Sequence, residues 1–152
     1  MIKLSRMADY GVILMVRLAR YPGAITTAAE LAEETALPGP TVSKLLKELV
    51  RAGLLESQRG NSGGYTVAGP TEDITVADII AALDGPIALT ECMTDDGNVC
   101  EIEALCPTRT NWRQINEALV NALEGVSLLD MARPAVNVGS RLPLVTSADS
   151  RV

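Results

Sequence analysis

The chain has 152 residues, a net charge of −6 and 47% hydrophobic residues, which suits one domain or a small domain with an extension. It has no Phe and one Trp, so aliphatic side chains must build its core, which favours helices. No apolar run approaches the roughly 20 residues that span a bilayer, and the N-terminal residues lack signal-peptide architecture because Asp9 interrupts them. We therefore expect a cytoplasmic protein with reduced thiols and no membrane partner.

The first predicted helix covers about residues 5–19, where apolar side chains recur at three- and four-residue intervals. Ser5 is its expected N-cap, and Tyr21-Pro22-Gly23 ends it. Asp9 lies in the first turns, just off the apolar stripe. The helix pattern by itself favours a solvated carboxylate at Asp9, which suits the positive end of the helix dipole.

Two further helices follow with a tight turn between them. Thr27, with Glu30 as its capping-box partner, begins the first of them, and residues 37–40 form the turn. The next helix starts near residue 40 and ends at Gly53, where a left-handed backbone is expected. This is the order of a helix-turn-helix, and the exposed face of its second helix carries candidate DNA contacts. These are Thr41, Ser43, Lys44 and Lys47.

A β-hairpin is expected directly after these helices. Strands at residues 54–57 and 65–68 flank a Gly-rich turn at residues 59–64, and this hairpin forms a wing with Arg59 as a further DNA contact. The alternative is a generic helical hairpin with a surface turn and merely solvated cations. The order of the elements and their short connections favour the winged helix.

The uneven charge agrees with this interpretation. Residues 1–70 carry eight Lys and Arg against six Asp and Glu, a net of +2. Residues 71–152 carry five against thirteen, a net of −8. Binding to DNA depends on where positive charge lies, so the N-terminal half is the expected contact surface.

The C-terminal half has two more predicted helices. Thr75 caps one over residues 76–83, and Thr108 or Thr110 begins a long one that Gly125 ends. The long helix carries an apolar stripe, which indicates a dimer interface, although it could also pack on the first helix. Residues 127–132 are expected to add one more turn before a tail without periodicity.

The predicted fold class is mainly α with a small β-hairpin wing, as a winged helix-turn-helix with a long C-terminal dimerisation helix. The expected parts are a DNA-binding domain at 1–70, a connecting helix and cysteine loop at 71–107, the dimerisation helix at 108–132 and a mobile tail at 133–152.

All three cysteines lie in one polar loop, with the spacing Cys-x7-Cys-x5-Cys at Cys92, Cys100 and Cys106. Thiolates suit zinc, copper(I) or an iron–sulfur cluster. The alternatives are ordinary buried thiols, or a disulfide with one thiol left over. The chain has no His, so a fourth ligand must be a carboxylate, another protein group, a small molecule or a residue of a second chain.

The sequence does not predict an enzyme. Without His it lacks the commonest acid–base group, and it has neither a phosphate-binding Gly motif before a helix nor a nucleophile elbow. The wing glycines lie between strands, where turn geometry explains them.

Over about residues 1–132 the chain resembles the Rrf-two family of bacterial winged-helix regulators, which includes IscR-like, NsrR-like and SUF-system regulators. The resemblance rests on four stretches, the last being the three clustered cysteines before a long helix. The other three are Ile-Lys-Leu-Ser-Arg-Met-Ala-Asp-Tyr at 2–10, Leu-Val-Arg-Ala-Gly-Leu-Leu at 49–55 and Arg-Gly-Asn-Ser-Gly-Gly-Tyr at 59–65.

The resemblance implies a homodimer in which Cys92, Cys100 and Cys106 ligate an iron–sulfur cluster. In IscR-like members a His shortly after the third cysteine completes the site, but this sequence has Arg109 there. In NsrR-like members an Asp near the start of helix one of the other subunit does so, and Asp9 matches that position. The analogy with carboxylate ligation favours 4Fe–4S over 2Fe–2S. Rival ligands within the loop are Glu91, Asp95, Asp96, Glu101 and Glu103.

The resemblance further implies a repressor that binds a palindromic operator in double-stranded DNA. It would sense cluster status, oxygen or nitric oxide and control SUF-type iron–sulfur assembly genes or a stress response. One alternative keeps the DNA-binding dimer but gives the cysteines a thiol-redox or zinc role. Another is a winged-helix protein-interaction module that does not bind DNA.

Overall fold

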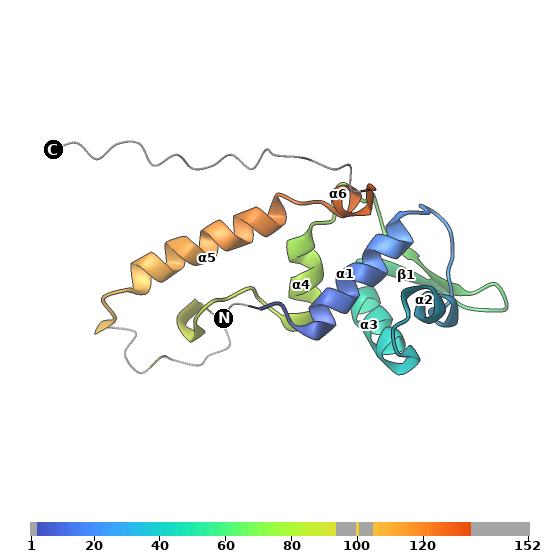
Figure 1. Cartoon of the computed structure of the whole chain (residues 1–152), viewed down its shortest axis with the longest axis horizontal. Helices are drawn as coiled ribbons and strands as arrows, with labels where there is room; N and C mark the ends of the chain where they lie inside the picture. The colour runs from blue at the N-terminus through green and yellow to red at the C-terminus, as the bar shows by residue number, and fades with distance from the viewer. Residues whose placement is uncertain (1–2, 94–99, 101–104, 135–152) are drawn as a thin grey trace.

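The computed structural model describes residues 3–93, 100 and 105–134 (Figure 1). Its described residues are mostly helical with one two-stranded antiparallel sheet, so the predicted mainly α class with a β-hairpin wing is confirmed, while the dimerisation role of the C-terminal helix stays a prediction. In chain order the elements are α1 (Arg6–Ala19), α2 (Ala28–Thr35), α3 (Gly39–Arg51), β1 (Leu55–Gln58), β2 (Gly64–Val67), α4 (Val76–Asp84), the 3-10 helix η1 (Glu91–Met93), α5 (Arg109–Glu124) and α6 (Leu128–Ala132). None of the described helices is long and apolar enough to cross a membrane.

Helix α1 lies at the centre of the core. Its Leu14, Met15 and Leu18 are buried, and the helix packs against α3, α4 and α6. Burial of one such side chain contributes about 1.5–3 kcal/mol, so this face dominates the stability of the domain. The side chains that meet it from the other helices are Leu31, Val42, Leu45, Leu46, Leu49, Ile79 and Leu128.

The predicted caps are present at the starts of α1, α2 and α4. The Ser5 hydroxyl accepts from the Ala8 N–H at 3.0 Å and donates to Asp84 Oδ1 at 2.7 Å, which links the start of α1 to the end of α4. Both Thr27 with Glu30 and Thr75 with Asp78 form capping boxes, the second with a carboxylate partner that the sequence analysis did not name. A third box, Ser127 with Asp130, starts α6.

Helix α3 begins at Gly39, about one residue earlier than expected, with Pro40 in its first turn. Two residues beyond its last helical residue, Gly53 has φ +78°, the left-handed conformation that was expected at this exit.

The wing is held along β2 by a third segment. Strands β1 and β2 pair with Leu55 opposite Val67, each strand shifted by about one residue from its expected position. The Thr26 N–H donates to Tyr65 O at 3.0 Å, and the Tyr65 N–H donates to Thr26 O at 2.8 Å. Since Thr26 precedes the N-cap of α2, this bridge fixes the wing relative to the helix-turn-helix.

Helix α5 runs away from the rest of the domain (Figure 1). It has no buried side chain, and its main contacts are with α4 and η1. Near its end, Leu123 packs on a small cluster of Ala8, Val76 and Ile80, so the alternative of packing on α1 holds only at this end of the helix. The predicted tail lies outside the described residues beyond position 134.

The bridge between Thr26 and β2 generates a stability prediction. A Cβ at Gly64 would lie 2.6 Å from the backbone oxygen of Thr26, which cannot move without breaking the bridge. We expect Gly64→Ala to lower the free energy of unfolding in urea by about 1–3 kcal/mol. Gly69→Ala is the control, because a Cβ there meets no heavy atom within 4 Å. Equal losses in the two variants would contradict this account of the wing.

Candidate nucleic-acid interface and cysteine site

Helix α3 divides its side chains between the core and the surface. Lys44 and Lys47 are exposed, and Thr41 and Ser43 are half-buried. The core side of the same helix buries Val42, Leu45, Leu46 and Leu49. The four predicted contact residues therefore lie outside the core on one helix, as a recognition helix requires.

Arg59 lies on the exposed turn that joins β1 to β2. Among the residues that the structure describes, Arg59, Lys44 and Lys47 take part in no ion pair. Their charges are therefore not neutralised within the described part of the protomer. Cations in this state on a helix and an adjacent wing suit contact with a phosphate backbone.

The cysteines lie in η1 and in the connection that leads from η1 to α5. Cys92 is in η1, and Cys106 precedes the first turn of α5 by three residues. All three thiols, including that of Cys100, are free and half-buried. A threonine hydroxyl lies beside each outer cysteine: Thr90 Oγ1 is 3.2 Å from Cys92 Sγ, and Thr108 Oγ1 is 3.5 Å from Cys106 Sγ.

The start of α5 favours a thiolate at Cys106. A hydrogen bond from the Thr108 hydroxyl, with backbone N–H groups of Thr108 and Arg109 and the Arg109 charge, holds the pKa of Cys106 below its ordinary value. Thr108 occupies the predicted N-cap position, but its side chain caps no backbone N–H. The hydroxyl serves the sulfur instead, and a thiolate is the form that binds metals and reacts with oxidants.

A single amide holds the segment before Cys92 against α5. The Leu89 N–H donates to Asn116 Oδ1 at 2.9 Å, and Asn116 Nδ2 donates to Ile87 O at 3.1 Å. Asn116 was not among the predicted site residues. Its signal was available, because Asn116 interrupts the apolar stripe of α5 one turn after Trp112.

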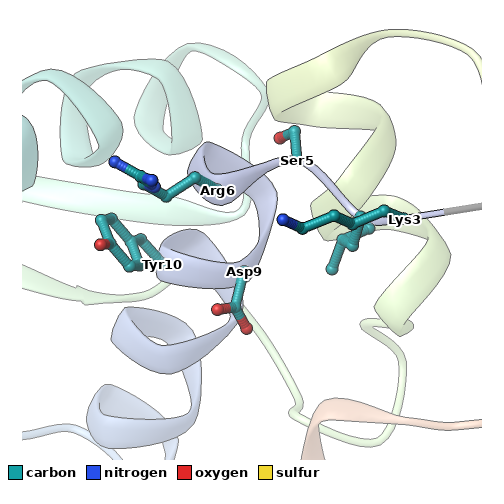
Figure 2. Close-up of a pocket in the computed structure, with 6 residues that line it drawn as sticks. Lys3, Ser5, Arg6, Asp9 and Tyr10 are labelled. Carbon is teal, nitrogen blue, oxygen red and sulfur yellow. The ribbon is translucent and has the colours of Figure 1, made fainter.

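Asp9 is exposed on α1, more than 80 residues before the first cysteine in the sequence. It lines a shallow hollow of about 670 Å³ together with Lys3, Arg6 and Tyr10 (Figure 2). It also lines a second hollow of about 430 Å³, between α1 and Met131 of α6. The second hollow is lined by apolar side chains of α1 and also by the charged Arg17, Arg20 and Glu34.

Within the described ranges, no three Cys, Asp or Glu side chains are grouped closely enough to hold a metal ion. The structure therefore does not bring Asp9 and the three cysteines together in one protomer. The donor set nevertheless fits a soft metal in kind, since it offers three free thiols of which Cys106 has a lowered pKa. Of the rival ligands, Glu91 is exposed in η1; Asp95, Asp96, Glu101 and Glu103 lie outside the described residues.

Comparison with known proteins gives a family and a set of solved relatives. The profile of the Rrf2 family, described as an iron-dependent transcriptional regulator, matches residues 4–134. The chain is 31% identical over 131 residues to the HTH-type transcriptional regulator CymR of Bacillus subtilis, which covers 86% of this chain and 89% of that protein.

Three solved structures share the fold. CymR of B. subtilis, described as the global cysteine regulator, matches with a TM-score of 0.70 and 32% identity, covering 87% of this chain and 97% of that one. The oxidized form of Staphylococcus aureus CymR gives 0.67 and 30%, covering 88% and 98%. T. potens IscR gives 0.66 and 30%, covering 86% and 85%. These relatives are transcriptional regulators and not enzymes, as the absence of catalytic motifs predicted.

The contact between Thr108 and Cys106 generates a prediction about thiol reactivity. Thr108→Val removes the hydroxyl, so the pKa of Cys106 should rise and its alkylation at pH 7 should slow. Mass spectrometry of the labelled peptide, followed over a range of pH, measures both effects at Cys106 alone. Thr110→Val on the exposed first turn is the control and should leave the profile unchanged. A Cys106 profile that is the same in Thr108→Val and wild type would disprove the role of this hydroxyl.

Proposed function

Because the chain belongs to the Rrf2 family of transcriptional regulators, we propose that it is a DNA-binding homodimer that responds to an iron–sulfur cluster. In this proposal Cys92, Cys100 and Cys106 hold the cluster, which is of the 4Fe–4S type. The protein represses genes of SUF-type iron–sulfur assembly, or of a stress response, from a palindromic operator. The observation that carries the proposal is that all three thiols are free and that Cys106, just before α5, has a lowered pKa.

DNA recognition in this proposal uses the outward side of α3 and the wing. Thr41, Ser43, Lys44 and Lys47 enter the major groove, where the hydroxyls and ammonium groups meet base edges and phosphates. Arg59 on the wing reaches a phosphate or the minor groove. The bridge between Thr26 and Tyr65 supports this arrangement, because it holds the wing at a set position beside the helix-turn-helix.

Exposed apolar side chains support a homodimer. Trp112 and Ile115 on α5 are 39% and 48% exposed, and Ile13 on α1 and Met131 on α6 are 39% and 41% exposed. Large apolar side chains on adjoining helices of a small domain indicate an interface. A two-fold dimer that pairs α5 of one protomer with the α1 and α6 surface of its partner would cover both groups.

Asp9 is the proposed fourth ligand, supplied to the cluster by the partner protomer. It borders the same hollow as Ile13 and Met131, so a partner helix docked there would end near its carboxylate. When bound, the cluster would supply a centre open to oxygen or nitric oxide, since a carboxylate is displaced more easily than a thiolate. Because α1 packs on α3, a bond at Asp9 would bear on the helix that reads DNA.

A second candidate function is a thiol-redox regulator without a cluster, and the lowered pKa of Cys106 favours it equally. One solved relative is an oxidized form of CymR, and another is described as a global cysteine regulator. A colourless protein that forms a disulfide on oxidation would support this candidate. A colourless protein that holds zinc would assign the cysteines to a zinc site.

The DNA interface is tested by charge removal on α3. We expect Lys44→Ala and Lys47→Ala to weaken operator binding and each to reduce the slope of log affinity against log salt by about 0.9. Fluorescence anisotropy with the operator over a salt series measures the slope. Arg113→Ala removes an exposed charge from α5 and should leave the slope unchanged. Lysine variants with the wild-type slope would contradict the assignment of α3.

The fourth ligand is tested by Asp9→Ala after anaerobic reconstitution with ferrous iron and sulfide. We expect the lifetime of the visible absorbance under a chelator to shorten by at least about tenfold, since a ligand matters no less than its outer-shell partners. Asp73→Ala, an exposed carboxylate away from both hollows, is the control. A lifetime equal to wild type would move the fourth ligand elsewhere and leave the three cysteines in place.

A further inference from the structure

The Asn116 side-chain amide makes two hydrogen bonds to the backbone of the segment before the first cysteine, as a neighbouring β-strand would. It accepts from the Leu89 N–H at 2.9 Å and donates to Ile87 O at 3.1 Å. Only one orientation of the amide serves both partners, since a backbone N–H needs the oxygen and a carbonyl needs the nitrogen. Asn116 is half-buried, so these two bonds are partly shielded from water.

These two bonds close the stretch of chain that contains every cysteine. Leu89 stands three residues before Cys92, and Asn116 stands ten residues after Cys106. Between these points the 3-10 helix η1 also lies against α5. The amide therefore sets how the backbone that carries Cys92 meets the helix that begins beside Cys106.

The connection made by Asn116 does not contribute to the main hydrophobic core. No side chain of α5 is buried, and the core beneath α1 is built from the other helices. Ile87 and Leu123 already hold the base of α5 to α4 through a small apolar cluster. The amide adds direction to this packing, because hydrogen bonds have a preferred geometry and apolar contacts do not.

We propose that Asn116 is a positioning residue for metal binding by the cysteines: its amide holds the Ile87–Leu89 backbone on α5 and so fixes Cys92 relative to Cys106. This inference rests on the proposed metal site at the cysteines. A metal centre bound by an already closed loop need not supply the free energy of ordering that loop. Losing the clamp should then cost metal retention more than it costs folding.

The test compares Asn116→Ala with Asn121→Ala, which removes the same amide from an exposed position on the same helix. Asn116→Asp keeps the shape and the acceptor for Leu89 but loses the donor to Ile87 O. The proteins are reconstituted anaerobically with ferrous iron and sulfide, and loss of visible absorbance is followed under a chelator. Hydrogen exchange of the Leu89 amide and the thermal midpoint are measured on the metal-free proteins.

We expect Asn116→Ala to lose the cluster about tenfold faster than wild type, a factor that corresponds to about 1.4 kcal/mol. The rate of cluster loss in Asn116→Asp should lie between those of wild type and Asn116→Ala, and the rate in Asn121→Ala should match wild type. In the metal-free Asn116→Ala protein the Leu89 amide should exchange at least about tenfold faster. The thermal midpoint should stay near that of Asn121→Ala, which separates positioning from a general loss of stability.

Cluster loss in Asn116→Ala at the wild-type rate would overturn the inference. A change in the rate of cluster loss that is equally large in Asn121→Ala would also overturn it. If wild-type protein takes up no iron and sulfide, the cluster proposal fails, and Co²⁺ titration followed by thiolate-to-metal absorbance then tests the clamp at the same cysteines. A roughly tenfold weaker Co²⁺ affinity in Asn116→Ala would support the clamp. Equal affinities, or no Co²⁺ binding to either protein, would overturn it.

Discussion

The packing of α1 is the constraint on which the other parts of this protein depend. Leu14, Met15 and Leu18 bury one side of this helix against α3, α4 and α6. The opposite side leaves Asp9 and Ile13 at the surface. The recognition helix and the proposed fourth ligand therefore belong to one packed unit, and closely packed interiors transmit displacement rather than absorb it. A ligand bond at the surface of α1 is in this way physically connected to the position of α3.

The two halves of the chain divide the work of such a regulator. The net charge of +2 in residues 1–70 suits a DNA surface, whereas the −8 of residues 71–152 keeps the cysteine region and α5 away from phosphate. Cys106 has a lowered pKa although its half of the chain is acidic, because the hydrogen bonds from Thr108 act directly on its sulfur. The start of this helix thus lowers the pKa of a neighbouring thiol, and its length carries exposed apolar side chains that suit a partner.

Local patterns in the sequence predicted most of the fold, and contacts between distant segments account for what they missed. Ser5, Thr27 and Thr75 were identified as caps because capping depends on residues three positions apart. The bridge from Thr26 to Tyr65 and the clamp at Asn116 join residues 39 and about 28 positions apart, and no periodicity reports such pairs. Helix α5 was located by its stripe, but its partner α4 was not, since a stripe shows that a face is apolar and not what covers it. In the proposal, the cysteines converge on one metal centre through a loop and a second protomer. Neither the spacing of the cysteines nor the structure of one protomer determines this convergence.

The most direct test of the account is one measurement on wild-type protein purified without oxygen: its iron and acid-labile sulfide per chain, with operator affinity determined on the same sample before and after the metal is removed. The account predicts a coloured protein with iron and sulfide in matching amounts, and an affinity that changes when they are removed. A protein that stays colourless after anaerobic reconstitution, or one whose operator affinity is indifferent to the cluster, would contradict it.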